Sequence, residues 1–158
     1  GRSDAPLMAK RLLDKKYTID ALVSSPAVRA KKTAELFSET LKMPAEEIIF
    51  ISALNHGPPE VFYEVVSGLP DELDTVAVFS HNPGISYFVN SLNSGIKVDN
   101  MPTCAVFVVS ADITAWSGFN KAKKEFLFLQ YGKFTDITGY TYPGRHCCGQ
   151  EANISGRF

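Results

Sequence analysis

The sequence has no uninterrupted apolar run near the roughly 20 residues that a membrane-spanning helix needs. It also has almost no net charge, because 16 lysine and arginine residues stand against 17 acidic ones and leave −1 at pH 7. A chain without excess positive charge offers no electrostatic footprint for nucleic acid or for an acidic membrane surface. We therefore expect neither partner. We recognise no signal peptide.

Cysteine is scarce, with only Cys104, Cys147 and Cys148. An odd count with two adjacent cysteines does not make a disulfide framework, and it favours a reduced, cytoplasmic setting. The adjacent pair lacks Cys-x-x-Cys spacing and has only His146 close by. We therefore expect no metal site there, and we expect no cofactor.

The residues that are present indicate an α/β domain, because short apolar strands alternate with amphipathic helices. The pattern predicts helices at 27–41, 60–67 and 85–92 and strands at 19–24, 48–51, 76–79, 105–109 and 125–131. This order favours a three-layer α/β/α architecture with a mainly parallel sheet. No clear helix separates the last two strands, so an antiparallel pair is expected at one edge.

The texture changes after residue 131, where glycine, threonine, tyrosine, serine and asparagine dominate without periodicity. We expect the α/β domain over 1–131 and an irregular tail over 132–158. The chain begins with Gly1 rather than methionine and opens directly on a helix signal. That beginning is typical of a piece of a longer protein.

Two strand ends carry candidate functional residues. Ser-Ser-Pro at 24–26 leads into a helix with Arg29 in its first turn, and Ser-His-Asn-Pro-Gly at 80–84 places His81 before another helix. Ligands bind at the carboxyl ends of strands in such sheets, and helix N-termini favour anions. A cation in a first turn opposes the helix dipole by roughly 0.3–1 kcal/mol. Arg29 is therefore either solvated or paired with an anion, and together with His81 it predicts a phosphate pocket.

Other polar residues have simpler interpretations. Ser25 and Asn82 suit turns, although we keep Asn82 as a phosphate-binding candidate. His56 lies in a Gly-Pro loop and is expected to be exposed, with the pocket rim as the alternative. Glu60 is a candidate proton donor, but a carboxylate in a first helical turn needs no such reason. Thr103 is either a strand-entry residue or faces the pocket.

The ordered pair of motifs, Ser-Ser-Pro-x-x-Arg-x-x-x-Thr-Ala at 24–34 and His-Asn-Pro-Gly at 81–84, resembles the histidine phosphatase superfamily. The nearest branch is that of the small SixA-type phosphohistidine phosphatases, and the resemblance covers about 1–131. It implies a phosphoglycerate mutase-like fold and a metal-independent reaction through a phosphohistidine enzyme intermediate. On the matching positions it implies that Arg29 clamps the phosphoryl group and that His81 is the second histidine of the pocket.

The chain departs from this family at the nucleophile, which lies in an Arg-His-Gly or Arg-His-Ala motif after the first strand. Neither motif occurs in 1–158, and the only Arg-His pair, at 145–146, follows Tyr-Thr-Tyr-Pro-Gly rather than an apolar strand. We expect a missing N-terminal strand rather than a circular permutation. Residues 1–158 then hold half of a phosphatase pocket and do not complete the covalent step.

The first hypothesis is a phosphatase whose partner is a phosphohistidine protein or a small phosphorylated metabolite. The alternative is a non-catalytic module that binds phosphate or a phosphoprotein, favoured by the absent nucleophile. A third hypothesis is a serine hydrolase with Ser80 as nucleophile, but no Gly-x-Ser-x-Gly elbow supports it.

Overall fold

The computed structural model describes residues 4–132, 134–135, 145–150 and 152–157. Each predicted helix is present, and an amphipathic helix precedes the first strand. The α-helices are α1 (Asp4–Asp14), α2 (Val28–Thr40), α3 (Pro59–Ser67) and α4 (Gly84–Ser91). Short 3₁₀ turns lie at Ala45–Glu47, Ser52–Asn55 and Trp116–Gly118.

The strands join into a single mixed sheet. They are β1 (Ala21–Ser24), β2 (Ile49–Phe50), β3 (Thr75–Phe79), β4 (Val106–Ala111), β5 (Lys124–Tyr131), β6 (Phe134–Thr135), β7 (Arg145–Gln150) and β8 (Ala152–Arg157). β1 runs parallel to both β2 and β3, with Ser24 opposite Phe79. β4, β5 and β6 pair antiparallel. The α/β prediction is thus confirmed, and the antiparallel part is wider than a single edge pair.

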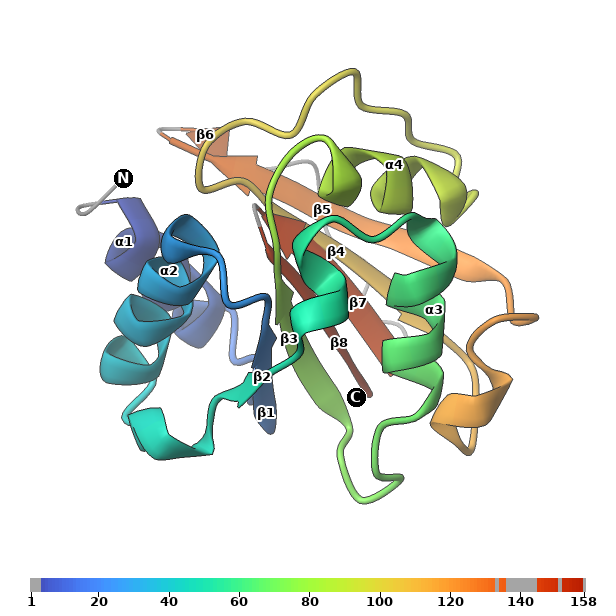
Figure 1. Cartoon of the computed structure of the whole chain (residues 1–158), viewed down its shortest axis with the longest axis horizontal. Coiled ribbons are helices and arrows are strands. Elements are labelled where there is room, and N and C mark those ends of the chain that lie inside the picture. The colour runs from blue at the N-terminus through green and yellow to red at the C-terminus, as the bar shows by residue number, and fades with distance from the viewer. Residues whose placement is uncertain (1–3, 133, 136–144, 151, 158) are drawn as a thin grey trace.

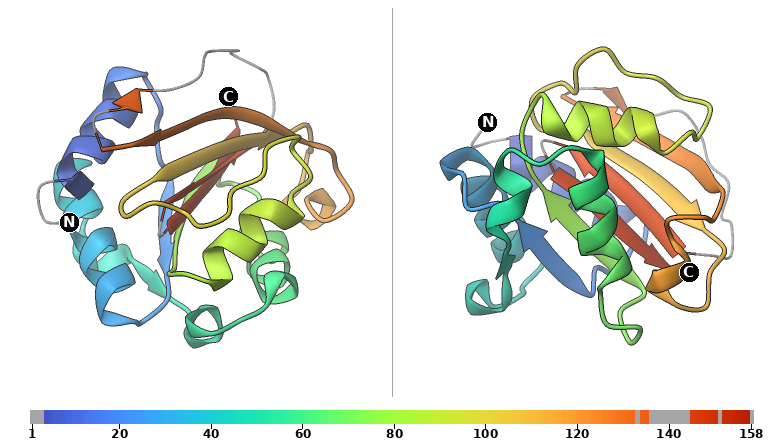
Figure 2. Two further views of the ribbon diagram at one scale, coloured as in Figure 1. Left: turned by 90° about the horizontal axis from the view of Figure 1, so that it is seen from above. Right: turned by 45° about the vertical axis from the view of Figure 1, so that its right-hand side comes forward.

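Helices cover both faces of the sheet, which produces the predicted three layers (Figures 1 and 2). α1 and α2 pack on one face, where the Phe37 ring meets the Phe79 ring edge-on at a centroid distance of 5.1 Å. α3 and α4 pack on the other, where the Phe62 and Phe88 rings stack at 4.8 Å. Because β1 and β3 are covered on both sides, every one of their residues is buried.

The segment after residue 131 contains strands where we predicted an irregular tail. β7 and β8 form a hairpin; β8 pairs antiparallel with β3, and β7 pairs antiparallel with β4. This hairpin joins the parallel and antiparallel parts of the sheet. Glycine and polar residues dominate the segment, so its sequence has no strand periodicity to reveal it. The division into a domain over 1–131 and a separate tail stays a prediction.

The hairpin register fixes which of its residues lie near each edge of the sheet. Ala152 is opposite Phe79, the last residue of β3, whereas His146 is opposite Thr75, the first. The end of the hairpin where Gln150 pairs with Ala152 therefore lies at the edge where β3 ends, and the Arg-His pair lies at the other edge.

Within the described residues, no helix is both long enough and apolar enough to cross a membrane.

Candidate active site

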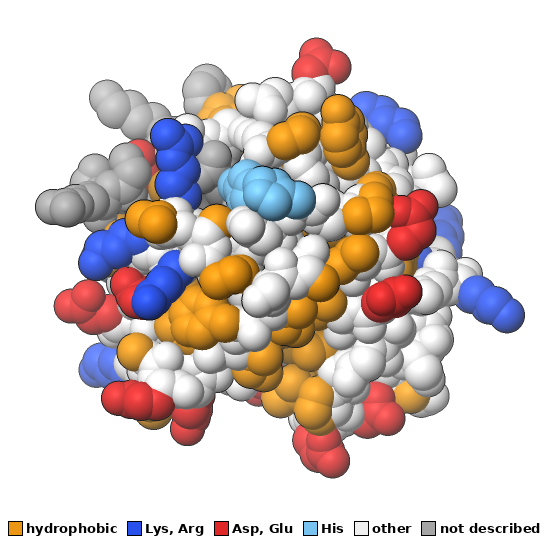
Figure 3. Space-filling model, in the orientation of Figure 1, with side chains coloured by type: hydrophobic (Ala, Val, Ile, Leu, Met, Phe, Trp, Pro, Cys, Tyr) orange, Lys and Arg blue, Asp and Glu red, His pale blue; other side chains and the backbone are white. Residues whose placement is uncertain are grey.

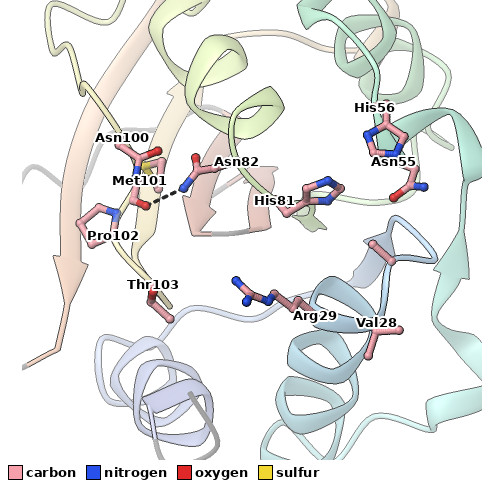
Figure 4. Close-up of a pocket in the computed structure, with 11 residues that line it drawn as sticks. Val28, Arg29, Asn55, His56, His81, Asn82, Asn100, Met101, Pro102 and Thr103 are labelled. Atoms are coloured by element: carbon pink, nitrogen blue, oxygen red, sulfur yellow. Dashed lines mark hydrogen bonds between the residues drawn. The ribbon is translucent and has the colours of Figure 1, made fainter.

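A pocket of about 760 Å³ lies where β1 and β3 end and where the chain enters β4 (Figure 4). Its walls come from four separate segments: the start of α2, the 52–56 loop, the turn before α4 and the 100–103 segment. The lining residues are Ala27, Val28, Arg29, Asn55, His56, His81, Asn82, Asn100, Met101, Pro102 and Thr103.

Backbone hydrogen bonds align the carboxyl end of β1 with those of its neighbours β3 and β2. The Ser25 N–H donates to the Phe79 carbonyl at 2.9 Å, and the Ile51 N–H donates to the Ser24 carbonyl at 2.9 Å. The chain leaves β1 and β3 at the same height, so the residues that follow both strands face one space. This arrangement brings Arg29 and His81 together at one pocket.

Arg29 occupies the first turn of α2. That turn contains no acidic residue, and no side chain caps the helix N-terminus. Arg29 is exposed, and its guanidinium points across the pocket toward Thr103 (Figure 4). Uncapped N–H groups and a guanidinium at one pocket wall make this end of the helix a favourable place for an anion.

His81 follows Ser80, whose hydroxyl donates to the Leu54 carbonyl at 3.0 Å. This bond ties the end of β3 to the 52–56 loop. The His81 ring meets the His56 ring edge-on, with centroids 5.6 Å apart. The Nδ1 atom of His81 is buried and has no hydrogen-bond partner among the described residues. A buried polar atom without a partner is uncommon in folded proteins, which makes His81 a residue of interest at this wall.

Asn82 connects two walls of the pocket through a closed set of hydrogen bonds. Its amide Nδ2 donates to the Met101 carbonyl at 2.9 Å (Figure 4). The Ser86 hydroxyl donates to Asn82 Oδ1 and accepts from the Met101 N–H at 2.9 Å. The turn before α4 and the 100–103 segment are therefore fixed to each other. Asn82 has a structural task at the pocket, and its role as a phosphate ligand stays a prediction.

The fold places the remaining polar candidates at two different sites. His56 is exposed, as expected, and it also lines the pocket, as does Thr103. Glu60 instead lines a separate shallow depression beside Tyr63 and Asn120. Asn100 and Met101 were not predicted as pocket residues, because a loop without periodicity does not reveal what it faces.

No cluster of three or more histidine, cysteine or acidic residues that could hold a metal ion occurs in the part of the chain that the structure describes. The side chains of His146, Cys147 and Cys148 lie outside that description.

No family model matches the chain. It is 27% identical over 121 residues to phosphohistidine phosphatase SixA of Escherichia coli strain K12, a match that covers 76% of this chain and 75% of that protein. The solved structure of the protein histidine phosphatase SixA complexed with tungstate has a TM-score of 0.69 and 25% identity, covering 83% of this chain and 80% of that one. A SixA structure from Nakamurella multipartitia has a TM-score of 0.63 at 20% identity, covers 84% and 82% of the two chains, and shows the fold alone.

Proposed function

We propose that this pocket binds the phosphoryl group of a phosphohistidine protein for hydrolysis. The proposal starts from the relationship of the chain, which is a homologue of the SixA phosphohistidine phosphatases in the histidine phosphatase superfamily. A small phosphorylated metabolite is the alternative substrate. The proposal depends on one observation above all. Arg29 and His81, which follow two different strands, line a single pocket at the edge of the sheet where those strands end.

The two side chains have complementary tasks toward a phosphoryl group. Arg29 offers two parallel N–H donors, which match two phosphoryl oxygens. His81 donates from a ring nitrogen to a third oxygen and stabilises the charge there during transfer. The uncapped N-terminus of α2 adds backbone donors to the same anion. Asn82 supports this arrangement by holding the opposite wall in place.

In the proposed reaction the phosphorus–nitrogen bond of the substrate breaks, and the leaving imidazole nitrogen takes up a proton. The phosphoryl group passes first to a histidine of the enzyme, and water then attacks phosphorus to release inorganic phosphate. We assign the attacking histidine to a motif outside residues 1–158, because neither Arg-His-Gly nor Arg-His-Ala occurs within them. Residues 1–158 then supply phosphoryl binding without the covalent step.

The same missing motif favours a second candidate function, a module that binds phosphate or a phosphoprotein without hydrolysis. The coding sequence upstream of Gly1 distinguishes the two. A strand followed by Arg-His-Gly or Arg-His-Ala supports the enzyme. A start codon directly before Gly1 supports the binding module.

Anion binding to residues 1–158 tests the pocket itself. Tungstate, a tetrahedral oxyanion, is titrated calorimetrically against the unmodified chain and against Arg29→Ala and His81→Ala. A charge-assisted hydrogen bond contributes about 1.5–3 kcal/mol. Each variant should therefore lower the affinity roughly tenfold or more.

Lys32→Ala is the matched control, because it removes a positive charge from the same helix without touching the pocket. Lys32 lies near Glu35, with 3.9 Å between Nζ and Oε2, and it does not line the cavity. Its affinity should stay within twofold of the unmodified chain. If Arg29→Ala and His81→Ala both bind tungstate as tightly as Lys32→Ala, the assignment of the pocket is wrong.

A further inference from the structure

A second, smaller cavity adjoins the first. It has a volume of about 330 Å³ and shares Asn55, His56 and His81 with the phosphoryl pocket. The two cavities therefore lie on either side of the same residues, which include the histidine pair. The remaining walls of this second cavity, here called the side groove, are Gly57, Pro58, Pro59, Pro83, Gly84 and Tyr87.

The side groove differs chemically from the pocket beside it. None of its lining residues is aspartate, glutamate, lysine or arginine, whereas the phosphoryl pocket contains Arg29. Tyr87 forms one wall and is 60% exposed, so its ring is available to a partner. In Figure 3, hydrophobic side chains lie to the right of the histidine side chains and below them. A ligand that spans both cavities therefore needs an anionic end and an apolar end.

Close backbone packing builds the side groove before any ligand arrives. A Cβ atom at Gly57 would lie 2.6 Å from the Ala53 carbonyl oxygen and 2.9 Å from Val61 Cβ, so only glycine fits there. A Cβ atom at Gly84 would lie 3.3 Å from the Gly57 carbonyl oxygen, which shows how closely the two loops approach. Pro59 begins α3 and stiffens the adjoining wall. Preformed walls lower the ordering cost of binding.

We propose that the side groove binds an apolar side chain that neighbours the phosphorylated residue in the protein substrate. This inference depends on the proposed function of the adjoining pocket. A phosphoryl group held between Arg29 and His81 leaves its polypeptide next to the histidine pair, where the groove opens. Its volume lies at the low end of the roughly 300–1,000 Å³ typical of ligand pockets, which suits one side chain. Because Tyr87 supplies an aromatic face, we expect phenylalanine or leucine to be preferred over small or charged residues.

The test compares peptides that contain phosphotriazolylalanine, a stable analogue of phosphohistidine. One set has phenylalanine beside the analogue, on its N-terminal or its C-terminal side, and the other has glycine at these positions. Fluorescence polarisation against residues 1–158 should give about fivefold to tenfold tighter binding for at least one phenylalanine peptide. Tyr87→Ala should reduce this preference to less than twofold, whereas Tyr87→Phe should retain it.

Tungstate titration of each variant reports whether the phosphoryl pocket is intact. Leu13→Ala is the matched control, because Leu13 is an exposed apolar residue (44% exposed) on α1, away from both cavities. It should leave the peptide preference unchanged. If tungstate still binds, two results would overturn the proposal for the side groove. One is equal affinity for phenylalanine and glycine peptides, and the other is a preference that survives Tyr87→Ala. If neither tungstate nor any peptide binds the unmodified chain, the proposed function fails and the side groove fails with it.

Discussion

The hydroxyl of Ser86 is a small group that joins two walls of the pocket, and its removal gives a quantitative test of the site. Ser86 is 3% exposed. It donates to Asn82 Oδ1 and accepts from the Met101 N–H at 2.9 Å. Ser86→Ala deletes both bonds without adding volume. The buried Met101 N–H then loses the side-chain oxygen that accepts its hydrogen bond.

The expected cost follows from these partners. A buried N–H left without an acceptor costs about 1–3 kcal/mol. The second bond contributes about 1 kcal/mol, less where water reaches the half-buried Asn82. Alanine has a higher helix propensity than serine, and this offsets roughly 0.5 kcal/mol of the lost stability. We therefore expect Ser86→Ala to lower the free energy of unfolding by about 2 kcal/mol.

Urea denaturation followed by fluorescence measures this loss, because Trp116 is the single tryptophan and is fully buried. With a typical slope of about 2 kcal/mol per molar urea, the midpoint should fall by about 1 M. Tungstate affinity should fall severalfold as well, since the 100–103 wall loses its anchor to α4. Ser67→Ala is the control, because the Ser67 hydroxyl makes only an exposed bond to the Glu64 carbonyl within its own helix. If Ser86→Ala is no more destabilising than Ser67→Ala and binds tungstate normally, the two walls are not coupled through Ser86.

Two further substitutions test the packing of the fold, the first of them beside the site. Gly57→Ala places a methyl group 2.6 Å from the Ala53 carbonyl oxygen; this overpacking should cost about 1–3 kcal/mol in urea denaturation and displace His56 from the pocket rim. Unchanged stability would show that the 52–56 loop adapts freely. Trp116→Phe removes the indole N–H that donates to the Leu73 carbonyl at 2.8 Å, just before β3, and thermal unfolding should show a loss of about 1–3 kcal/mol. A loss below about 0.5 kcal/mol would mean that water replaces this donor.

The sequence predicts the functional edge of the sheet because local patterns determine it. β1 and β3 are short and wholly apolar apart from their ends, and each is followed at once by a helix. Parallel strands of this kind end at the same edge, so the residues after them meet. Arg29 and His81 are therefore predicted to meet on the condition that the two strands are neighbours, and the pairing of β1 with β3 fulfils it.

Apart from Thr103, which was a candidate, the far wall of the pocket could not be predicted in this way. The segment 100–103 has no periodicity, and it faces the pocket only because Met101 bonds to Ser86 and Asn82, which lie 15 and 19 residues earlier. Side-chain hydrogen bonds across that separation leave no pattern in one sequence. The pairing of His56 with His81 is similar, because it depends on the Ser80 hydroxyl reaching the Leu54 carbonyl.

The β7–β8 hairpin bears directly on where the nucleophile can lie. A circular permutation would have to place the Arg-His pair at 145–146 beside the pocket, at the edge where β3 ends. The register instead sets His146 opposite Thr75, four residues before Phe79. At about 3.3 Å per residue, the backbone of His146 is about 13 Å along the strand from that edge. Gln150 and Ala152, the paired residues at that end of the hairpin, lie at the pocket edge in its place. This separation argues against the permuted motif.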